Sequence, residues 1–207
     1  NPLFMILKRV VVRGLGALTP IGNNIGDFWQ GLASGKSGGA PITYYDTSKS
    51  KIKFACELKN FDISDFLDRK EHRRMDKFTQ YAMVSTEEAI NDSGLDLDSI
   101  DKLRVGVIWG SGIGGIETFQ NEILNFAAGD GTPRFNPFFI PKLIGDIAPG
   151  HIAIKYGFMG LNYATVSACA SSANALADSL NYIRLGHCDI IVAGGSEAGV
   201  NIAGMSG

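Results

Sequence analysis

The stretch LNYATVSACASS, residues 161–172, decides the fold, because an apolar run passes within a few small residues into a helical pattern. Residues 161–167 have the length and composition of a buried strand. Residues 170–185 then repeat apolar side chains at helical spacing. The small residues on either side of Cys169 allow a sharp reversal of the chain between strand and helix. A strand that feeds directly into a helix is the repeating unit of α/β proteins.

The rest of the chain repeats this alternation. We predict further strands at 10–12, 104–109 and 189–193. We predict helices from Asn24 or Asp27 to about residue 35, over 70–93 with Gly94 as C-cap, over 116–126, and over 143–156 with a break near Pro149. Residues 34–53 are expected to form a loop and 136–141 an extended segment. Strands that alternate with helices indicate a parallel or mixed sheet covered on both faces.

Composition limits the class of protein. The chain has 207 residues, 45% hydrophobic and 19% charged, which fits one large domain or a domain and part of another. A net charge of −2 gives no general reason to expect nucleic-acid binding. Three cysteines without metal-type spacing argue against zinc and a disulfide framework and favour a reduced, cytoplasmic setting. We expect no membrane span, signal peptide, metal or cofactor.

Cys169 is the strongest candidate for chemistry. At the start of a helix, unpaired N–H groups and the helix dipole favour the thiolate over the thiol. A thiolate in a crevice is a good nucleophile for thioester exchange. The alternative is a small buried apolar residue, since free cysteine is among the most buried residue types. Cys56 and Cys188 have the pattern of ordinary loop and core positions.

The glycine run at residues 110–115 offers a competing motif. Gly110, Gly112 and Gly115 match the dinucleotide-binding fingerprint between a strand and a helix. The acidic residue expected at the end of the next strand, about twenty positions on, is missing. A packing role, in which these glycines allow close backbone approach, is therefore favoured over nucleotide binding.

Histidines and the basic segment 69–77 give weaker signals. His72, His151 and His187 have no evident acid or base partner in the sequence. The basic segment concentrates positive charge at the start of a predicted helix. From the pattern alone a solvated face is favoured, with a docking patch for an acidic partner as the alternative.

Six motifs in order give a family resemblance. They are residues 9–16 (RVVVRGLG), 69–76, 110–115, 137–139 (PFF), 167–171 (SACAS) and 193–197 (AGGSE). Together they resemble the first half of a β-ketoacyl-[acyl-carrier-protein] synthase, most closely the elongating type II enzyme of bacterial fatty-acid synthesis. The resemblance covers the chain from Met5 onward. Residues 1–4 are then a remnant or short extension, and 5–207 the N-terminal half.

The resemblance implies a thiolase-like fold of layered αβαβα architecture, of which this chain supplies about the first half, in a homodimer. It places the acyl-accepting nucleophile at Cys169, with its N–H in the oxyanion hole. It implies that Ile113 lines the acyl pocket and that Phe139 reaches the pocket of the partner subunit. The docking surface for acidic acyl-carrier protein falls on Lys70, Arg73 and Arg74, which reverses the preference for a solvated face.

The sequence also departs from the family's pattern. The two histidines, the lysine and the second oxyanion donor of the family's active site belong to a second half that is not in this sequence. His151 matches a helical position outside that set, and Arg13 stands where relatives usually carry a small polar residue. We therefore expect that the 207 residues alone do not condense acyl and malonyl groups.

Three other readings remain. One is another thiolase-fold condensing enzyme, such as a polyketide ketosynthase or a starter-unit enzyme. A second is a scaffold similar to a chain-length factor, a class that lacks the nucleophilic cysteine. The third is a dinucleotide-binding oxidoreductase built on the glycine run.

Overall fold

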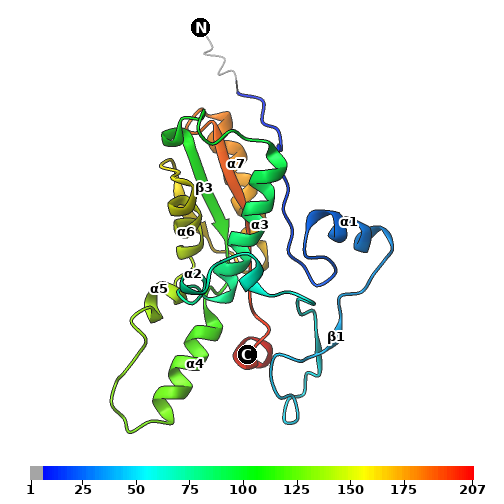
Figure 1. The fold of residues 1–207 in the computed structure, drawn as a ribbon, viewed down its shortest axis with the longest axis vertical. Coiled ribbons are helices and arrows are strands. Elements are labelled where there is room, and N and C mark those ends of the chain that lie inside the picture. The colour runs from blue at the N-terminus through cyan, green and yellow to red at the C-terminus, as the bar shows by residue number, and fades with distance from the viewer. Residues whose placement is uncertain (1–6) are drawn as a thin grey trace.

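The computed structural model describes residues 7–207, and its centre is a three-stranded parallel sheet (Figure 1). Strand β3 (Val105–Gly110) lies between β4 (Asn162–Thr165) and β5 (Ile190–Gly195). The register sets Gly110 opposite both Thr165 and Gly195. The carboxyl ends of all three strands therefore meet at one edge. The residues 1–4 for which we predicted a separate origin lie outside the described range.

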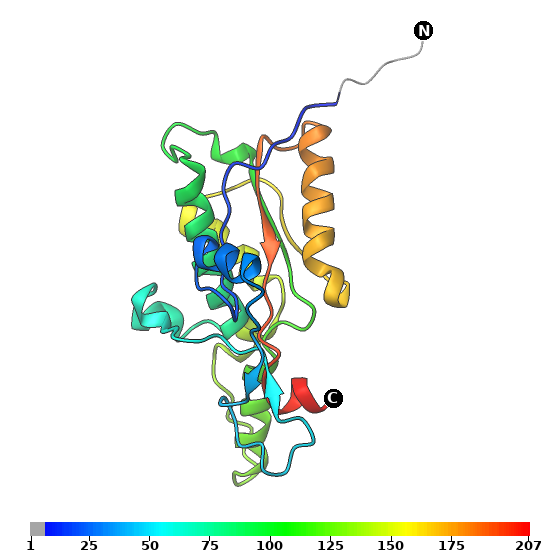
Figure 2. The same ribbon diagram turned by 90° about the vertical axis from the view of Figure 1, so that its right-hand side faces the viewer.

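Helices cover both faces of this sheet, as the sequence predicted (Figure 2). Helix α7 (Ser171–Arg184) packs on one face, and α3 (Lys77–Ser93) and α6 (Ile147–Tyr156) pack on the other. All six residues of β3 are buried, which explains why the strand reads as a continuous apolar run.

The remaining elements surround this layered core. They are α1 (Ile25–Ala33), the antiparallel pair β1 (Ala40–Pro41) and β2 (Phe54–Ala55), the short 3-10 helices η1 (Ile63–Asp65), η2 (Lys102–Arg104) and η3 (Ala168–Ala170), and the helices α2 (Arg69–His72), α4 (Ile116–Ala127), α5 (Phe139–Leu143) and α8 (Ile202–Ser206). Within residues 7–207, no helix has the length and apolarity needed to cross a bilayer.

Local signals located several boundaries correctly. The Asn24 side chain accepts a hydrogen bond from the Asp27 N–H at 2.8 Å and begins α1. Gly94 ends α3 in the left-handed conformation, with φ 62°. The helix predicted over 116–126 is α4. Each of these signals acts within a few residues of chain, so the sequence contains all that is needed.

The strand predicted at 10–12 is wrong. Val11 and Val12 are exposed and belong to no ladder. The following segment lies against α3 instead, where the N–H groups of Leu15 and Ala17 donate to the carboxylates of Asp92 and Glu88 at 2.9 and 2.8 Å. A β-carbon at Gly14 or Gly16 would overlap the backbone of α3. Helix side chains thus satisfy backbone groups that a neighbouring strand would otherwise bond.

The single helix predicted over 70–93 is also wrong, because two helices, α2 and α3, occupy this range. Asp76 interrupts the helix with an extended backbone, φ −74° and ψ 162°. Its buried carboxylate accepts from the Phe78 N–H at 3.3 Å and caps α3. The same carboxylate accepts from the N–H and hydroxyl of Thr118 at 3.0 and 2.6 Å, in the first turn of α4. One acidic group therefore satisfies the starts of two helices.

The segment predicted as extended over 136–141 instead turns into helix α5. The Asn136 side chain accepts from the Phe138 N–H at 2.8 Å and starts the turn. Pro141 is the third residue of α5, and Pro149 is the third residue of α6. A proline in the first turn removes an N–H that has no partner within the helix. The prolines therefore mark helix starts here, and α6 begins at Ile147 without the break we expected.

We predict that Asp76→Ala lowers the free energy of unfolding by about 2–4 kcal/mol, because it removes a cap and leaves the part-buried donors of Thr118 unpaired. Asp68→Ala is the matched control, since Asp68 caps the four-residue α2 from an exposed position. We expect this control to cost about 1 kcal/mol or less. Denaturant unfolding of both variants measures the difference, and equal losses would contradict the two-helix role of Asp76.

Candidate active site at the carboxyl ends of the strands

Cys169 lies in η3, between the end of β4 and the start of α7, and its side chain is exposed. This position is at the edge where the carboxyl ends of the strands meet, which is where α/β sheets usually bind ligands. In the described part of the chain, no group accepts a hydrogen bond from the Cys169 N–H. The turn therefore presents both a thiol and a free backbone donor.

The turn itself is held by Ser171. Ala168 has a positive φ of 50°, a conformation that costs energy for a residue with a side chain. The buried Ser171 hydroxyl accepts from the Ser167 N–H at 2.9 Å and donates to the Ala168 carbonyl at 2.7 Å. Thr165 donates from its hydroxyl to the Ser171 carbonyl at 2.8 Å. These three bonds fix both sides of the turn that carries Cys169.

Glycines at the strand ends let α7 approach the sheet. A β-carbon at Gly110 would overlap the peptide between Ser171 and Ser172, and one at Gly195 would overlap the Ser172 side chain. Gly110 also accepts from the Ser196 N–H at 3.0 Å. Because β3 and β5 end in glycine, the first turn of α7 sits directly against both strands.

Ile113 lies in the neighbouring turn, which follows β3, and its side chain is 54% exposed. This turn abuts the Cys169 turn, because a β-carbon on Gly112 would lie 3.5 Å from the Ala168 carbonyl oxygen. Oε2 of Glu197 accepts from the Gly112 and Ile113 N–H groups at 2.6 and 3.2 Å. The structure therefore brings the turns that carry Cys169 and Ile113 side by side.

The glycine run has the close-packing role that the sequence favoured. The Gly114 N–H donates to the Ser111 hydroxyl at 3.0 Å, and the Gly115 N–H donates to the Leu143 carbonyl at 3.0 Å. A phosphate cradle needs such N–H groups unpaired. Here they are already bonded, and the carboxylate of Asp76 occupies the start of α4. This arrangement does not fit a dinucleotide.

Phe139 is half-buried in α5, beyond the carboxyl end of β3 (Figure 1). Its ring stacks on Phe135 and Phe119, with centroids 5.3 and 6.2 Å away. Phe119 belongs to α4, so this aromatic cluster joins α5 to the helix that follows the Ile113 turn.

Lys70, Arg73 and Arg74 are exposed on and just after α2. The Arg74 guanidinium lies 5.2 Å from the ring centroid of Phe138, next to Phe139. Lys77, at the start of α3, pairs with Glu117 of α4 at 3.0 Å. The basic segment is therefore attached to α4 and α5, the helices that flank the glycine turn.

The other candidates lie apart from Cys169. Cys188 is buried two residues before β5, and Cys56 is exposed after β2. Burial lowers the pKa of His151 in α6 below its usual value, which favours the neutral imidazole. Within residues 7–207, no histidine hydrogen bonds to Cys169, and no three His, Cys, Asp or Glu side chains are grouped as metal ligands.

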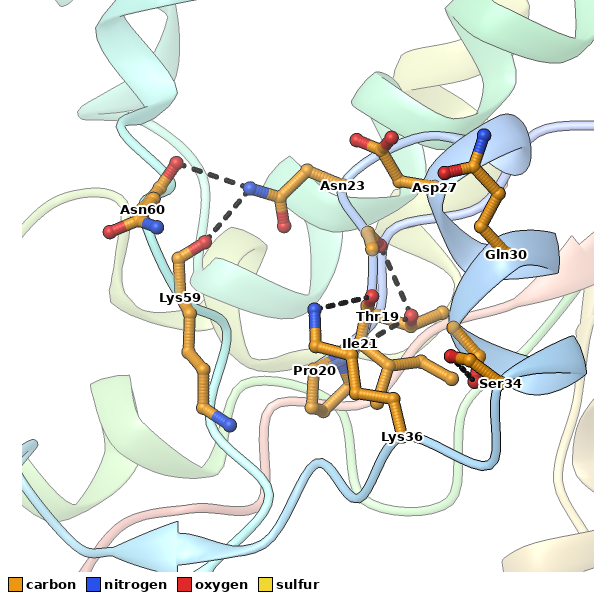
Figure 3. A pocket seen from close by; sticks show the side chains of 12 residues that line it. Thr19, Pro20, Ile21, Asn23, Asp27, Gln30, Ser34, Lys36, Lys59 and Asn60 are labelled. Carbon is orange, nitrogen blue, oxygen red and sulfur yellow. Dashed lines mark hydrogen bonds between the residues drawn. The ribbon is translucent and has the colours of Figure 1, made fainter.

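A polar pocket of about 490 Å³ lies beside α1 (Figure 3). Its wall includes Asn23, whose amide donates to the carbonyls of Lys59 and Asn60. Lys36 points across it to the Ile21 carbonyl at 3.2 Å. The pocket shares no residue with the Cys169 and Ile113 turns, so it is separate from the candidate active site.

Comparison with known sequences decides the family. Residues 7–207 match the family described as "Beta-ketoacyl synthase, N-terminal domain". The chain belongs to the β-ketoacyl synthase family.

Two curated relatives of this β-ketoacyl synthase chain carry the same name, 3-oxoacyl-[acyl-carrier-protein] synthase 2. The protein from Synechocystis sp. is 41% identical over 200 residues, covering 97% of this chain and 48% of the relative. The protein from Staphylococcus aureus strain COL is 45% identical over 203 residues, covering 96% and 49%. The chain therefore spans about half the length of the curated relatives that it matches.

Solved ketosynthase structures share the fold. The ishigamide ketosynthase/chain length factor superposes with a TM-score of 0.87 at 25% identity, covering 97% of this chain and 50% of that chain. A type II PKS ketosynthase in complex with its acyl-carrier protein gives 0.83 at 23%, covering 96% and 53%. A β-ketoacyl synthase from Burkholderia phymatum STM815 gives 0.77 at 24%, covering 90% and 46%. The thiolase-like α/β prediction is confirmed for the part of the fold that this chain forms.

Sequence reasoning gave no role to Ser171, Glu197 or Asp76. Each lies inside a quoted motif. The Ser171 hydroxyl bonds groups only three and four positions away, whereas Asp76 and Glu197 also bond groups that are distant in the sequence. Glu197 is 84 and 85 positions from the N–H groups that it accepts. Its place two residues after the glycine pair that ends β5 is the one local signal in the sequence.

We predict that Ser171→Ala lowers the free energy of unfolding by about 1–3 kcal/mol, because the buried Ser171 hydroxyl is lost and the part-buried Ser167 N–H loses its acceptor. It also slows alkylation of Cys169 by iodoacetamide, since the turn is no longer held. Ser179→Ala is the matched control on the same helix, where a buried hydroxyl donates only to the Ala175 carbonyl at 2.6 Å. Denaturant unfolding and peptide mass spectrometry give the two readouts; unchanged alkylation in Ser171→Ala would contradict the role of Ser171.

Proposed function

We propose that this chain supplies Cys169 as the acyl-accepting nucleophile of a 3-oxoacyl-[acyl-carrier-protein] synthase that elongates fatty acids. The observation that carries the proposal is an exposed cysteine, held at a strand–helix turn, in a chain of the β-ketoacyl synthase family. Curated relatives at 41–45% identity are named for this activity.

In the first half-reaction the Cys169 thiolate attacks the carbonyl carbon of an acyl thioester on the carrier protein. The carbonyl oxygen becomes an oxyanion and accepts a hydrogen bond from the Cys169 N–H, which has no other acceptor in the described residues. Collapse of this intermediate breaks the carbon–sulfur bond to the carrier. The carrier thiolate leaves and takes up a proton, and the acyl chain remains on Cys169.

In the second half-reaction malonyl-carrier protein loses CO2, and the carbanion that results attacks the Cys169 thioester. A carbon–carbon bond forms and the Cys169 thiolate leaves, which gives a chain longer by two carbons. The resemblance implies that two histidines outside this sequence stabilise the malonyl carbonyl. His72, His151 and His187 do not take that role in the proposal.

Ile113 and Phe139 define the path of the acyl chain in this proposal. Ile113 lies in the turn beside Cys169 and forms the wall of the acyl pocket. Phe139, on α5, reaches the pocket of the partner subunit in a homodimer. The exposed neighbours Phe138 and Ile140 on the same short segment support an interface there, with exposed fractions of 39% and 57%.

Acyl-carrier protein docks, in this proposal, on Lys70, Arg73 and Arg74 in the cytoplasm. All three side chains are exposed, and an acidic carrier is complementary to them in charge. The attachment of Arg74 to Phe138 sets this surface next to α5. A carrier protein bound here would therefore lie next to α4 and α5, the helices that flank the glycine turn.

A polyketide-type ketosynthase is the second candidate, because solved structures of that kind share the fold. Their identity to this chain, 25% or less, supports the fold and not the pathway. The relatives at 41–45% favour the fatty-acid enzyme. A chain-length-factor-like scaffold is disfavoured by the presence of Cys169 itself.

We predict that Cys169→Ala abolishes the covalent acyl adduct that forms when the full-length protein is incubated with acyl-carrier protein. Cys56→Ala is the matched control, because Cys56 is also exposed but lies after β2. Intact-protein and peptide mass spectrometry locate the adduct. Acylation that persists in Cys169→Ala, or disappears in Cys56→Ala, would overturn the assignment of the nucleophile.

We predict that Lys70→Glu lowers kcat/KM for acyl-carrier protein by about fivefold at low salt, since an exposed ion pair contributes up to about 1 kcal/mol. The loss shrinks as salt increases, because exposed charges are screened. Lys51→Glu makes the same charge change at an exposed lysine in the loop before β2 and is the control. A small acyl thioester without the carrier gives unchanged kinetics in both variants. Equal effects of the two substitutions would contradict docking at Lys70.

A further inference from the structure

Glu197 holds the turn that carries Ile113. The residue lies two positions after the end of β5, and its Oε2 accepts from the N–H groups of both Gly112 and Ile113, at 2.6 and 3.2 Å. Pairing of Gly110 with Gly195 brings the two segments side by side at the end of the sheet. Hydrogen bonds to an ionised carboxylate are about twice as strong as those between neutral groups.

The other half of this glycine turn is fixed by different groups. The Gly114 N–H is bound by the Ser111 hydroxyl, and the Gly115 N–H by the Leu143 carbonyl. In the described part of the chain, Glu197 is the only acceptor for the two N–H groups at positions 112 and 113. Packing does not replace it, because the Ile113 side chain is more than half exposed.

The Gly112 position links this carboxylate to the Cys169 turn. A β-carbon there would lie 2.9 Å from the Glu197 carboxylate oxygen on one side and 3.5 Å from the Ala168 carbonyl oxygen on the other. The peptide that Glu197 holds thus lies close to the residue that precedes the nucleophile, with room for about one methyl group between them. A shift of this peptide changes where the Ile113 side chain stands relative to Cys169.

We propose that Glu197 is a positioning residue: it fixes the Gly112–Ile113 peptide and thereby sets the range of acyl-chain lengths that Cys169 accepts. The inference rests on the proposed function, because it needs acyl transfer to Cys169. The carboxylate acts only as a hydrogen-bond acceptor, and neither proton transfer nor contact with the substrate is part of this role.

The test compares the full-length wild-type protein with Glu197→Ala, Glu197→Asp and Glu197→Gln. The readout is the rate of Cys169 acylation by carrier proteins loaded with a short and a long saturated chain, followed by mass spectrometry. We expect the ratio of the two rates to change by about tenfold in Glu197→Ala, the effect of losing one charge-assisted bond. Glu197→Asp, shorter by one methylene, shifts the ratio in the same direction.

Glu197→Gln separates positioning from acid–base chemistry. Its amide oxygen still accepts from the two N–H groups, so we expect a ratio close to wild type. Equal loss of rate in the Gln and Ala variants, for both chain lengths, would indicate proton transfer and overturn the proposal. A wild-type ratio in both the Ala and Asp variants would also overturn it.

Ile113→Ala completes a double-mutant cycle. If Glu197 acts through Ile113, the change in ratio from Glu197→Ala disappears in the Ile113→Ala background. Additive effects would overturn the proposal. Failure of the proposed function looks different, since the wild-type protein itself would then carry no acyl group on Cys169.

Discussion

The close approach of α7 to the ends of β3 and β5 is the constraint on which the site depends. It requires glycine at Gly110 and Gly195, because a β-carbon at either would overlap Ser171 or Ser172. With the helix start against the sheet, the chain leaving β4 has only the short turn at Cys169 in which to reverse. The same approach lets the Ser171 hydroxyl bond both sides of that turn. The exposed thiol is therefore a consequence of how the sheet ends.

Two carboxylates join neighbouring segments around this edge by accepting hydrogen bonds from their backbone N–H groups. Asp76 satisfies the first turns of α3 and α4, and Glu197 satisfies the turn between β3 and α4. Backbone N–H groups at helix starts and tight turns have no partner in regular structure, so an acceptor from another segment both satisfies and fixes them. As a result the basic segment before α3 is joined to α4, and the glycine turn before α4 is held next to the Cys169 turn.

Sequence reasoning was accurate where the interacting residues are close in the sequence and failed where they are far apart. The cap at Asn24, the end of α3 at Gly94 and the strands around Gly110 and Cys169 were found, because short-range signals and hydrophobic pattern define them. The strand predicted at residues 10–12 is wrong because the chain here runs along α3 and not beside another strand. The N–H groups of Leu15 and Ala17, just after it, bond α3 carboxylates that are 77 and 71 positions away in the sequence. The break at Asp76 was missed because one of the two helices that its carboxylate caps, α4, is bonded at Thr118, 42 positions along the chain.

The sequence by itself determined the class of fold, the family and the location of Cys169 between a strand and a helix. These depend on local pattern and on the order of the motifs, and both are visible in the sequence without a structure. Only the tertiary structure decided that the turn of Ile113 lies next to the turn of Cys169, and that Glu197 joins the ends of two strands. The same holds for the Ser171 hydroxyl, which bonds both sides of the Cys169 turn. The first two contacts join residues far apart in sequence, and the geometry of all three exists only once the parallel strands are paired and α7 is packed against them.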